Sequence, residues 1–390
     1  MSTKSFITPA LLATQLVFAQ TPIPALPAAG GTFIDPAYNT RILRVTDAAD
    51  GAFCGTVYSY WPTFNADSTR LMAACTVHVQ TWYEYYAVFY KINPSNLKLS
   101  GKTVLSGNYA SGIWSGLKPD TMLVLNSALP TGFSELNVAS GTLTPIKDIG
   151  TMLPGEYIWQ WHRSIDDDVF SWTRRSLKDY SQIGYAVWRR STNTLLLSVA
   201  NTVFDEVQLD KSGRYLVVKQ PFGSAAANQI EGEIIDLSTG KKTSLINCAP
   251  GFNLGHSDNG TGIQVGGENC TPSFRIRSLA NPEPSTVILT RQWSGTESHF
   301  SMLRDNESQV LVSFFGGSDP LSGELVLLTV AGSQTITHIC KHYSTWRSYY
   351  DSPRANISRK GDLAAFTSNW GNPDGRRDLF VADIRNSHVK

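Results

Sequence analysis

Residues 354–367 read RANISRKGDLAAFT, and this stretch decides the fold. The polar residue Arg354 comes first and a short strand follows it. A turn rich in Lys, Gly and Asp then reverses the chain, and a hydrophobic strand runs back. Gly and Asp readily adopt the positive φ angles that two-residue hairpin turns require. The stretch therefore predicts an antiparallel hairpin.

The same layout occurs seven times, and we call the first residue of each copy its anchor. Successive anchors lie 53, 48, 44, 50, 43 and 55 residues apart, and they are Trp61, Trp114, His162, Glu206, His256, His299 and Arg354. This period is typical of four-stranded propeller blades. Beyond the amino terminus no segment has a long 3.6-residue periodicity. The chain is predicted to be all-β, a seven-bladed β-propeller of four-stranded blades.

The two ends of the repeat region each hold an incomplete set of strands. A strand at residues 39–47 precedes the first copy without a partner, and the last copy ends in a strand at residues 378–384. We expect these strands to share one blade, because this closes the ring and removes the open edges of a linear stack of sheets. The propeller should then span residues 39–385, with 386–390 as a tail.

The amino terminus has the pattern of an export signal. Lys4 precedes an apolar run at residues 6–18, and Ala19, with Val17 two residues before it, gives the pattern that a signal peptidase requires. We predict a signal peptide at residues 1–19 and a Pro/Ala/Gly-rich linker at 20–38. No later stretch approaches the length of a membrane span. The protein is expected to be secreted or periplasmic.

Five cysteines follow the predicted signal, and in an exported chain close pairs indicate disulfides. Cys54 and Cys75 lie seven residues before and fourteen after their anchor, and Cys248 and Cys270 lie eight before and fourteen after theirs. We predict the disulfides Cys54–Cys75 and Cys248–Cys270, each joining the loop before an innermost strand to the following hairpin. Cys340 should stay unpaired.

Charge and motifs exclude several functions. The chain has 33 Lys and Arg against 32 Asp and Glu and no basic block, so no nucleic-acid partner is expected. The signatures GxSxG, HExxH, GxxxxGK[ST] and GxGxxG after a strand are absent. This argues against a serine hydrolase, a zincin, a nucleotide hydrolase and a dinucleotide enzyme, and no cofactor is predicted.

Residues 357–368, ISRKGDLAAFTS, resemble the repeats of TolB-like propellers, which have a serine, a turn and an I-A-F-x-S strand. The resemblance covers about residues 39–384. The layout of the whole chain is similar to secreted propeller polysaccharide lyases such as the oligogalacturonate and ulvan lyases, which implies lyase activity. In the oligogalacturonate lyases manganese binds a late His-x-His cluster. This chain has no such spacing, so no metal site is predicted.

Closure of the ring should bring the anchors to one mouth of the central channel. An imidazole can take a proton and an arginine can neutralise a carboxylate, and β-elimination at a uronic acid needs both. Tyrosine would supply the proton of the leaving group. The candidate pairs are His162 with Arg163 and His299 with Arg354. The predicted catalytic residues are His162, His299, Arg354 and Tyr349, and the predicted binding residues are His256, Glu206, Arg163, Trp61 and Trp114.

Other interpretations of the same residues stay open. Histidines at this position often hydrogen-bond within or between blades, and three histidines can also hold a metal ion. The leading hypothesis is a propeller that binds an acidic polysaccharide or oligosaccharide and cleaves it by β-elimination. The alternatives are a non-catalytic TolB-like propeller that binds a protein or glycan ligand at the channel mouth, and a purely structural scaffold.

Overall fold

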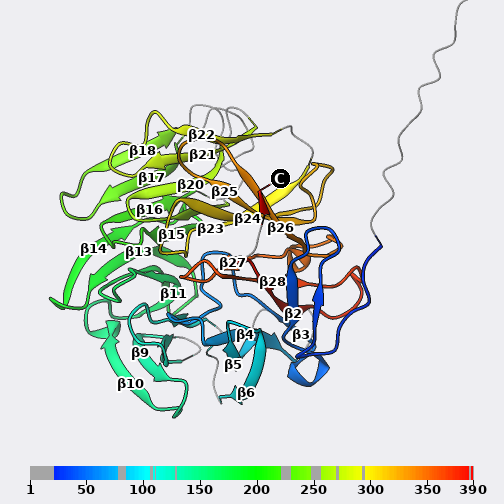
Figure 1. Ribbon diagram of the computed structural model, residues 1–390. Coiled ribbons are helices and arrows are strands. Elements are labelled where there is room, and N and C mark those ends of the chain that lie inside the picture. Colours follow the sequence, from blue (N-terminus) through cyan, green and yellow to red (C-terminus); the bar gives the residue numbers. More distant parts are fainter. Residues whose placement is uncertain are drawn as a thin grey trace, which may run out of the picture.

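The computed structural model describes residues 22–77, 85–105, 109, 111–127, 130–220, 230–246, 256–268, 272–291, 295–385 and 388–389. Within these residues the strands form seven antiparallel sheets, arranged as blades around a common centre (Figure 1). Helical structure in the described part is limited to three 3₁₀ turns, η1 (Ala48–Asp50), η2 (Ile149–Thr151) and η3 (Tyr349–Asp351). The predicted all-β seven-bladed propeller is confirmed.

Blades 1 to 3 each use four consecutive strands, and the first strand is the innermost. Figure 1 places the last strand of each of these blades at the rim. Their strands are β3 (Phe53–Gly55), β4 (Arg70–Thr76), β5 (Tyr85–Asn93) and β6 (Lys98–Val104); β7 (Ile113–Trp114), β8 (Thr121–Leu125), β9 (Gly132–Asn137) and β10 (Leu143–Asp148); β11 (Glu156–Arg163), β12 (Val169–Ser176), β13 (Gln182–Arg189) and β14 (Thr194–Ala200).

Blades 4 to 6 follow the same order, and blade 6 gains a fifth strand, β30 (His388–Val389), beside its outermost one. Their other strands are β15 (Glu206–Leu209), β16 (Tyr215–Lys219), β17 (Ile230–Asp236) and β18 (Lys242–Ile246); β19 (Ser257–Asn259), β20 (Ile263–Glu268), β21 (Ser273–Ser278) and β22 (Thr286–Thr290); β23 (Glu297–Ser301), β24 (Gln309–Phe315), β25 (Glu324–Thr329) and β26 (Ile336–Lys341).

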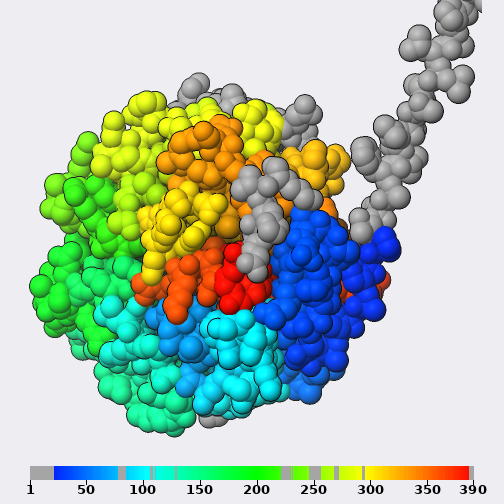
Figure 2. All heavy atoms as spheres, in the orientation of Figure 1, coloured from blue at the N-terminus to red at the C-terminus, as the bar shows by residue number. Residues whose placement is uncertain are grey.

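Blade 7 closes the ring with strands from both ends of the chain. Its order is β27 (Asn356–Ile357), β28 (Leu363–Ser368), β29 (Asp378–Asp383), β2 (Arg41–Arg44) and β1 (Thr32–Ile34). β2 pairs with β29 in antiparallel register, with Leu43 opposite Val381. In Figure 2 the blue and red ends of the sequence accordingly lie against each other. The prediction that residues 39–47 and 378–384 share a blade is confirmed.

The sheet extends past the boundaries predicted from the sequence. β1 lies inside the stretch 20–38 that was predicted to be a linker, and β30 lies inside the predicted tail 386–390. Both strands add to the outer edge of a complete blade, where a short strand carries little sequence signal. The predicted signal peptide at residues 1–19 lies outside the described residues. In the described part, no helix has the length and hydrophobicity needed to cross a membrane.

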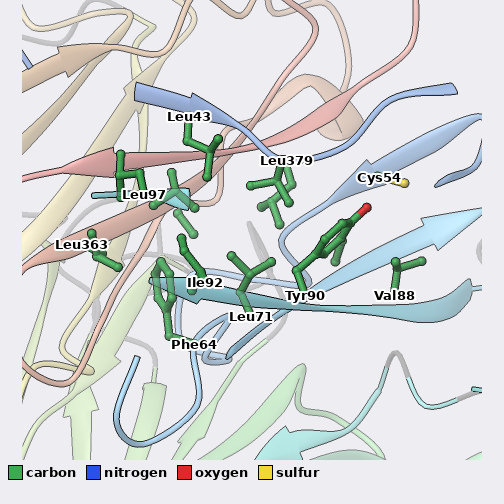
Figure 3. Packing of buried hydrophobic residues seen from close by; sticks show 14 of the residues in the cluster. Leu43, Cys54, Phe64, Leu71, Val88, Tyr90, Ile92, Leu97, Leu363 and Leu379 are labelled. Atoms are coloured by element: carbon green, nitrogen blue, oxygen red, sulfur yellow. The ribbon is translucent and has the colours of Figure 1, made fainter. Parts of the chain in front are cut away.

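The core lies between the blades. In the middle strands hydrophobic residues occupy both faces, because a neighbouring blade covers each face, and the run YLVVK of β16 is buried throughout. Figure 3 shows the contact between blades 7 and 1, where Leu43, Leu363 and Leu379 pack against Leu71 and Val88. Each such leucine contributes about 1.5–3 kcal/mol by leaving water. Packing of this kind holds the innermost strands in fixed positions around the centre.

The hairpin turns at the ends of the innermost strands are joined by hydrogen bonds from blade to blade. Two of the bonds cross a whole blade: Arg359 donates from Nη1 to the carbonyl of Gly116, and Lys211 donates from Nζ to the carbonyl of Arg304 at 2.6 Å. Hydrogen bonds therefore stabilise this face of the ring, both between adjacent blades and between blades separated by a third one. Bonds between adjacent blades include Ile165 N–H to Lys211 O, Lys211 N–H to Gly260 O and Asp305 N–H to Arg359 O.

One predicted disulfide is present in the described residues. Cys54 and Cys75 are bonded, and they stand directly opposite each other on β3 and β4. The disulfide thus joins two neighbouring strands of blade 1. The expected link between a loop and a hairpin was wrong, because Cys54 already belongs to the innermost strand. Cys248 and Cys270 lie outside the described residues, and Cys340 is buried and free.

Candidate functional site

Three of the anchors occupy equivalent positions on uninterrupted strands, and Trp61 has the same spacing before Asn65 on a strand that is interrupted. Glu206, His256 and Arg354 each lie four residues before the residue whose N–H closes the hairpin to the second strand. His162 lies two residues before its equivalent, so it is on the same side of its strand, because side chains alternate with a period of two. The hairpin-closing residues are Asp210, Gly260, Ser358 and Ser164.

Trp114 and Arg163 are one residue from the hairpin-closing position, so they point to the other side of their strands. The Trp114 ring packs on Phe89 at 5.8 Å, and its Nε1–H donates to the carbonyl of Thr63 at 3.0 Å. Arg163 donates from Nη2 to the carbonyl of Trp114 at 2.6 Å and lies 3.2 Å from Asp167. Both side chains are engaged in contacts between blades, and the structure does not bring them to the other anchors.

The innermost strand of blade 1 is interrupted. Gly55 pairs with Ala74, and the next ladder contact is the Met72 N–H donating to the Thr63 carbonyl at 2.9 Å. Residues 56–62 leave the ladder between these points and carry two tyrosines, Tyr58 and Tyr60, toward the centre. The anchor Trp61 lies in the same segment and packs against the hydrophobic core between blades 2 and 3.

Ring contacts join these tyrosines to the histidine anchors. The rings of His256 and His299 are 4.5 Å apart, and His299 meets Tyr58 edge-on at 5.0 Å. Tyr58 contacts Tyr60 at 4.6 Å, and Tyr60 contacts His162 at 6.1 Å. Together with the charged neighbours described below, these residues form what we call the central cluster: Tyr58, Tyr60, His162, Glu206, Lys219, His256, His299 and Arg354.

A buried ion pair occupies one side of the central cluster. Lys219 donates from Nζ to Glu206 Oε1 at 2.6 Å and to the carbonyl of Ser257 at 3.3 Å. The Tyr60 hydroxyl donates to Glu206 Oε2. The Lys219 side chain is 2% exposed, so its charge is held almost entirely by these partners.

Arg354 occupies the other side of the central cluster. It is 2% exposed, and its backbone is in the left-handed region at φ 42°, a conformation that is costly for a residue with a side chain. Nη1 donates to the carbonyl of Val57 at 3.4 Å, and the guanidinium lies 5.5 Å from the Tyr349 ring. Nε and Nη2 have no hydrogen-bond partner among the described residues, and neither ring nitrogen of buried His299 has one.

The histidines of the central cluster are uncharged at neutral pH. Burial, together with the charges of Arg163 and Lys219, lowers the pKa of His162 to about 3. Burial and Lys219 lower the pKa of His256 to about 4. Burial, His256 and Arg354 hold the pKa of His299 well below its usual range. Each neutral imidazole keeps a free lone pair, and its lowered pKa makes it a weaker base than an exposed histidine.

The tyrosines of the central cluster have the opposite character. Burial and the carboxylate of Glu206 raise the pKa of Tyr60 far above its ordinary value. Burial, Tyr349 and Glu206 raise the pKa of Tyr58 in the same way. Both phenols therefore keep their protons. The arrangement brings imidazoles and phenols into contact, and the charge of Arg354 is close enough to influence the pKa of His299 and of Tyr58.

Tyr58, Tyr60 and Lys219 were missed by the sequence prediction. The two tyrosines precede the first anchor, and a pattern that starts at Trp61 gives no reason to include them. Lys219 offered a visible signal, because a lysine ends the otherwise hydrophobic run YLVVK. A charge at the end of a buried strand needs a partner, and that requirement points to the site.

The described residues contain no group of three or more His, Cys, Asp or Glu side chains placed to hold a metal ion. His256 and His299 are in contact, and the nearest carboxylate to His256 that forms a pair with it is Glu297, 3.7 Å from Nδ1. Among the described residues, the donor set around the two histidines therefore does not match a metal centre.

No protein-family model matches the sequence, and no curated protein matches it. Solved structures do match its fold. An oligogalacturonate lyase in complex with manganese aligns over 93% of this chain and 97% of its own, with a TM-score of 0.66 and 14% identity. The oligogalacturonate lyase of Vibrio parahaemolyticus aligns over 92% and 99%, with a TM-score of 0.65 and 13% identity. The Neurospora crassa Pan2 WD40 domain aligns over 88% and 91%, with a TM-score of 0.51 and 10% identity. These likenesses show the propeller fold.

Proposed function

We propose that this protein binds an acidic polysaccharide or oligosaccharide and cleaves it by β-elimination at a uronic acid, outside the cytoplasm. The observation that carries the proposal is the environment of Arg354. A buried guanidinium with Nε and Nη2 unpartnered among the described residues is matched to a planar carboxylate, which accepts two parallel hydrogen bonds. The full-length likeness to oligogalacturonate lyases and the Cys54–Cys75 disulfide support the substrate class and the location.

The chemistry follows from the protonation states. With the carboxylate held by Arg354, the carbon next to it becomes acidic, because the guanidinium stabilises the charge that grows there. Neutral His299 takes the proton from that carbon, a double bond forms to the neighbouring carbon, and the bond from that carbon to the glycosidic oxygen breaks. Tyr58 or Tyr349 gives its proton to the departing oxygen, so the products are a neutral hydroxyl end and an unsaturated uronate.

Roles for the remaining predicted residues follow from position. His256 contacts His299 and lies on the solvent side, with its side chain 32% exposed, where a sugar can meet it. His162 and Glu206 contact Tyr60 on the other side of the cluster. We retain three further residues as proposed binding residues: Trp61, Trp114 and Arg163. The contacts of Trp114 and Arg163 with neighbouring blades favour a structural role for those two.

The test is a screen of the purified protein against uronic-acid polysaccharides, following the ultraviolet absorbance of unsaturated products. Arg354→Ala should lower kcat/KM by about a hundredfold or more, as loss of a donor to a developing oxyanion does, while the fold persists. His299→Ala should be nearly inactive. If the wild-type protein binds these glycans and no product forms, the protein is the non-catalytic glycan-binding propeller, and the same variants should weaken affinity.

A further inference from the structure

The segment between β26 and β27, residues 342–355, contains no strand and is nevertheless built with many hydrogen bonds. Its centre is Asp351, which is buried. The N–H groups of Arg347 and Ser348 donate to Asp351 Oδ2 at 3.1 and 3.0 Å, and Arg377 and Asn369 donate to Oδ1 at 2.6 and 2.9 Å. A segment with so many bonds to one buried carboxylate holds its side chains in fixed positions.

This segment presents two large aromatic side chains to solvent. Trp346 is 40% exposed and Tyr349 is 42% exposed. The underside of the Trp346 ring rests on Gly316: a Cβ added at that glycine would lie 2.7 Å from the indole, so the absence of a side chain there makes room for it. Each ring packs on the protein with one part and leaves the rest in water, on a loop held in place, and loops of this kind often carry binding surfaces.

Both rings are connected to residues of the central cluster by contacts. Trp346 contacts Phe315 at 5.9 Å, and Phe315 stacks on His299 at 4.9 Å with an interplanar angle of 19°. Tyr349 lies over the guanidinium of Arg354 at 5.5 Å. One intervening ring separates Trp346 from His299. A sugar lying on Trp346 would therefore be a neighbour of the sugar held at His299 and Arg354.

We propose that Trp346 and Tyr349 form a second sugar-binding subsite, which takes the ring next to the uronate bound by Arg354. This inference rests on the proposed function and deepens it: aromatic stacking on this segment binds the second ring of the glycan. The flat faces of indole and phenol pack on the C–H groups of a pyranose, and the contact of the Tyr349 ring with the Arg354 guanidinium would place the second ring beside the bound uronate. The guanidinium of Arg347, the next residue along the chain, is already paired with Asp374 at 2.6 Å, so the two aromatic faces carry the proposed subsite.

The experiment measures affinity by isothermal titration calorimetry against the galacturonate monomer, dimer and trimer. Trp346→Ala should bind the dimer and trimer about tenfold more weakly than the wild type and the monomer equally well. Trp346→Phe, which keeps a flat ring, should recover most of the loss. The matched control is Tyr180→Ala, which removes another exposed aromatic ring from the β12–β13 turn, where its ring contact is with Tyr157.

The outcomes separate this inference from the proposed function. An equal loss for monomer and trimer in Trp346→Ala, or the same loss in Tyr180→Ala, overturns the subsite. Product formation by the wild type with a Trp346→Ala variant of unchanged KM overturns the subsite and leaves the lyase. Binding that depends on length without any product supports the subsite and removes the catalysis. If the wild type binds no member of the series, both proposals fall.

Discussion

Lys219 and Glu206 form an ion pair, Nζ to Oε1 at 2.6 Å, that lies between two histidines of the central cluster. Through the carbonyl of Ser257, Lys219 also bonds to the residue that follows His256. Glu206 in turn accepts the proton of the Tyr60 hydroxyl, and Tyr60 contacts His162. One buried cation thus faces both imidazoles, and its carboxylate partner holds a phenol in place.

Lys219→Met should raise the pKa of both His162 and His256. The variant removes a positive charge that disfavours their protonation and leaves the negative charge of Glu206 unbalanced beside them. NMR titration of the imidazole nitrogens measures the two values directly. Lys118→Met, which breaks the exposed pair with Glu135, is the matched control and should change neither pKa. Unchanged values in Lys219→Met would show that burial alone sets them.

The folded protein should lose stability as the pH falls from about 6.5 toward 4. Burial lowers the pKa of His342 to about 4 and that of His162 to about 3, whereas an unfolded histidine titrates near 6.5. Below about pH 6.5 the unfolded chain therefore takes up protons that the folded chain does not, at up to about 1.4 kcal/mol per pH unit for each histidine. Urea unfolding at several pH values gives the slope. His342→Gln should flatten it, and an unchanged slope contradicts the assignment.

Removing the Cys54–Cys75 disulfide should cost about 3 kcal/mol, because the bond closes a loop with a sequence separation of 21. The loop includes residues 56–62, so we also expect the environments of Tyr58 and Tyr60 to loosen. The double variant Cys54→Ala/Cys75→Ala, followed by thermal unfolding and near-ultraviolet circular dichroism, tests both effects. Non-reducing peptide mapping of the wild type should recover this pair, and it also tests the predicted Cys248–Cys270 pair.

Gly116→Ala should destabilise the face where the hairpin turns meet. A Cβ at Gly116 would lie 1.8 Å from the carbonyl oxygen of Ile165, so the turn must move, and the bond from Arg359 must move with it. We expect a loss of about 1–3 kcal/mol in the free energy of unfolding. Gly267→Ala is the control, since a Cβ there meets no atom within 4 Å, and it should stay within about 0.5 kcal/mol of the wild type.

Deletion of residues 378–390 should cause aggregation. It removes β29 and leaves β2 and β28 with unpaired edges in the same blade. Deletion of residues 386–390 alone removes only β30, which lies outside the four-stranded part of blade 6, and should leave the protein soluble. Size-exclusion chromatography compares the two. A soluble, cooperatively folding 378–390 deletion would contradict the need for closure.

The ring could be predicted from the sequence because its turns are local. Each hairpin needs Asn, Asp or Gly at fixed places, as in the RKGD turn before Leu363, and the regular return of such turns gives the number of blades. The pairing of β2 with β29 could be predicted because the sequence has one unmatched strand near each end, and pairing these two strands closes the ring. No local sequence feature identifies β1 or β30, because each is a fifth strand added to a blade that already has four.

The site could be predicted only in part, for two physical reasons. A shift of one residue along a strand reverses the side on which a side chain lies, so aligning Trp114 with Arg354 placed it in the wrong group. The other reason is the interruption of the strand at residues 56–62, which brings Tyr58 and Tyr60 to the centre. The sequence gives the length of the interrupted segment. It does not show which residues the side chains of that segment contact, and those contacts are seen only in the three-dimensional structure.

The pairing of β2 with β29 also sets an order in time. Arg44 and Asp378, which are bonded at 2.8 Å across this pair, are 334 residues apart in the sequence. At ribosomal rates of about 5–20 residues per second, β2 waits roughly 17 to 67 seconds before its partner exists. During that interval blade 7 cannot form, while blades 1 to 6 can assemble one after another. A nascent chain therefore stays an open arc for most of its synthesis, and a protein that holds the β2 edge during this interval would delay the final closure without opposing the rest of the fold.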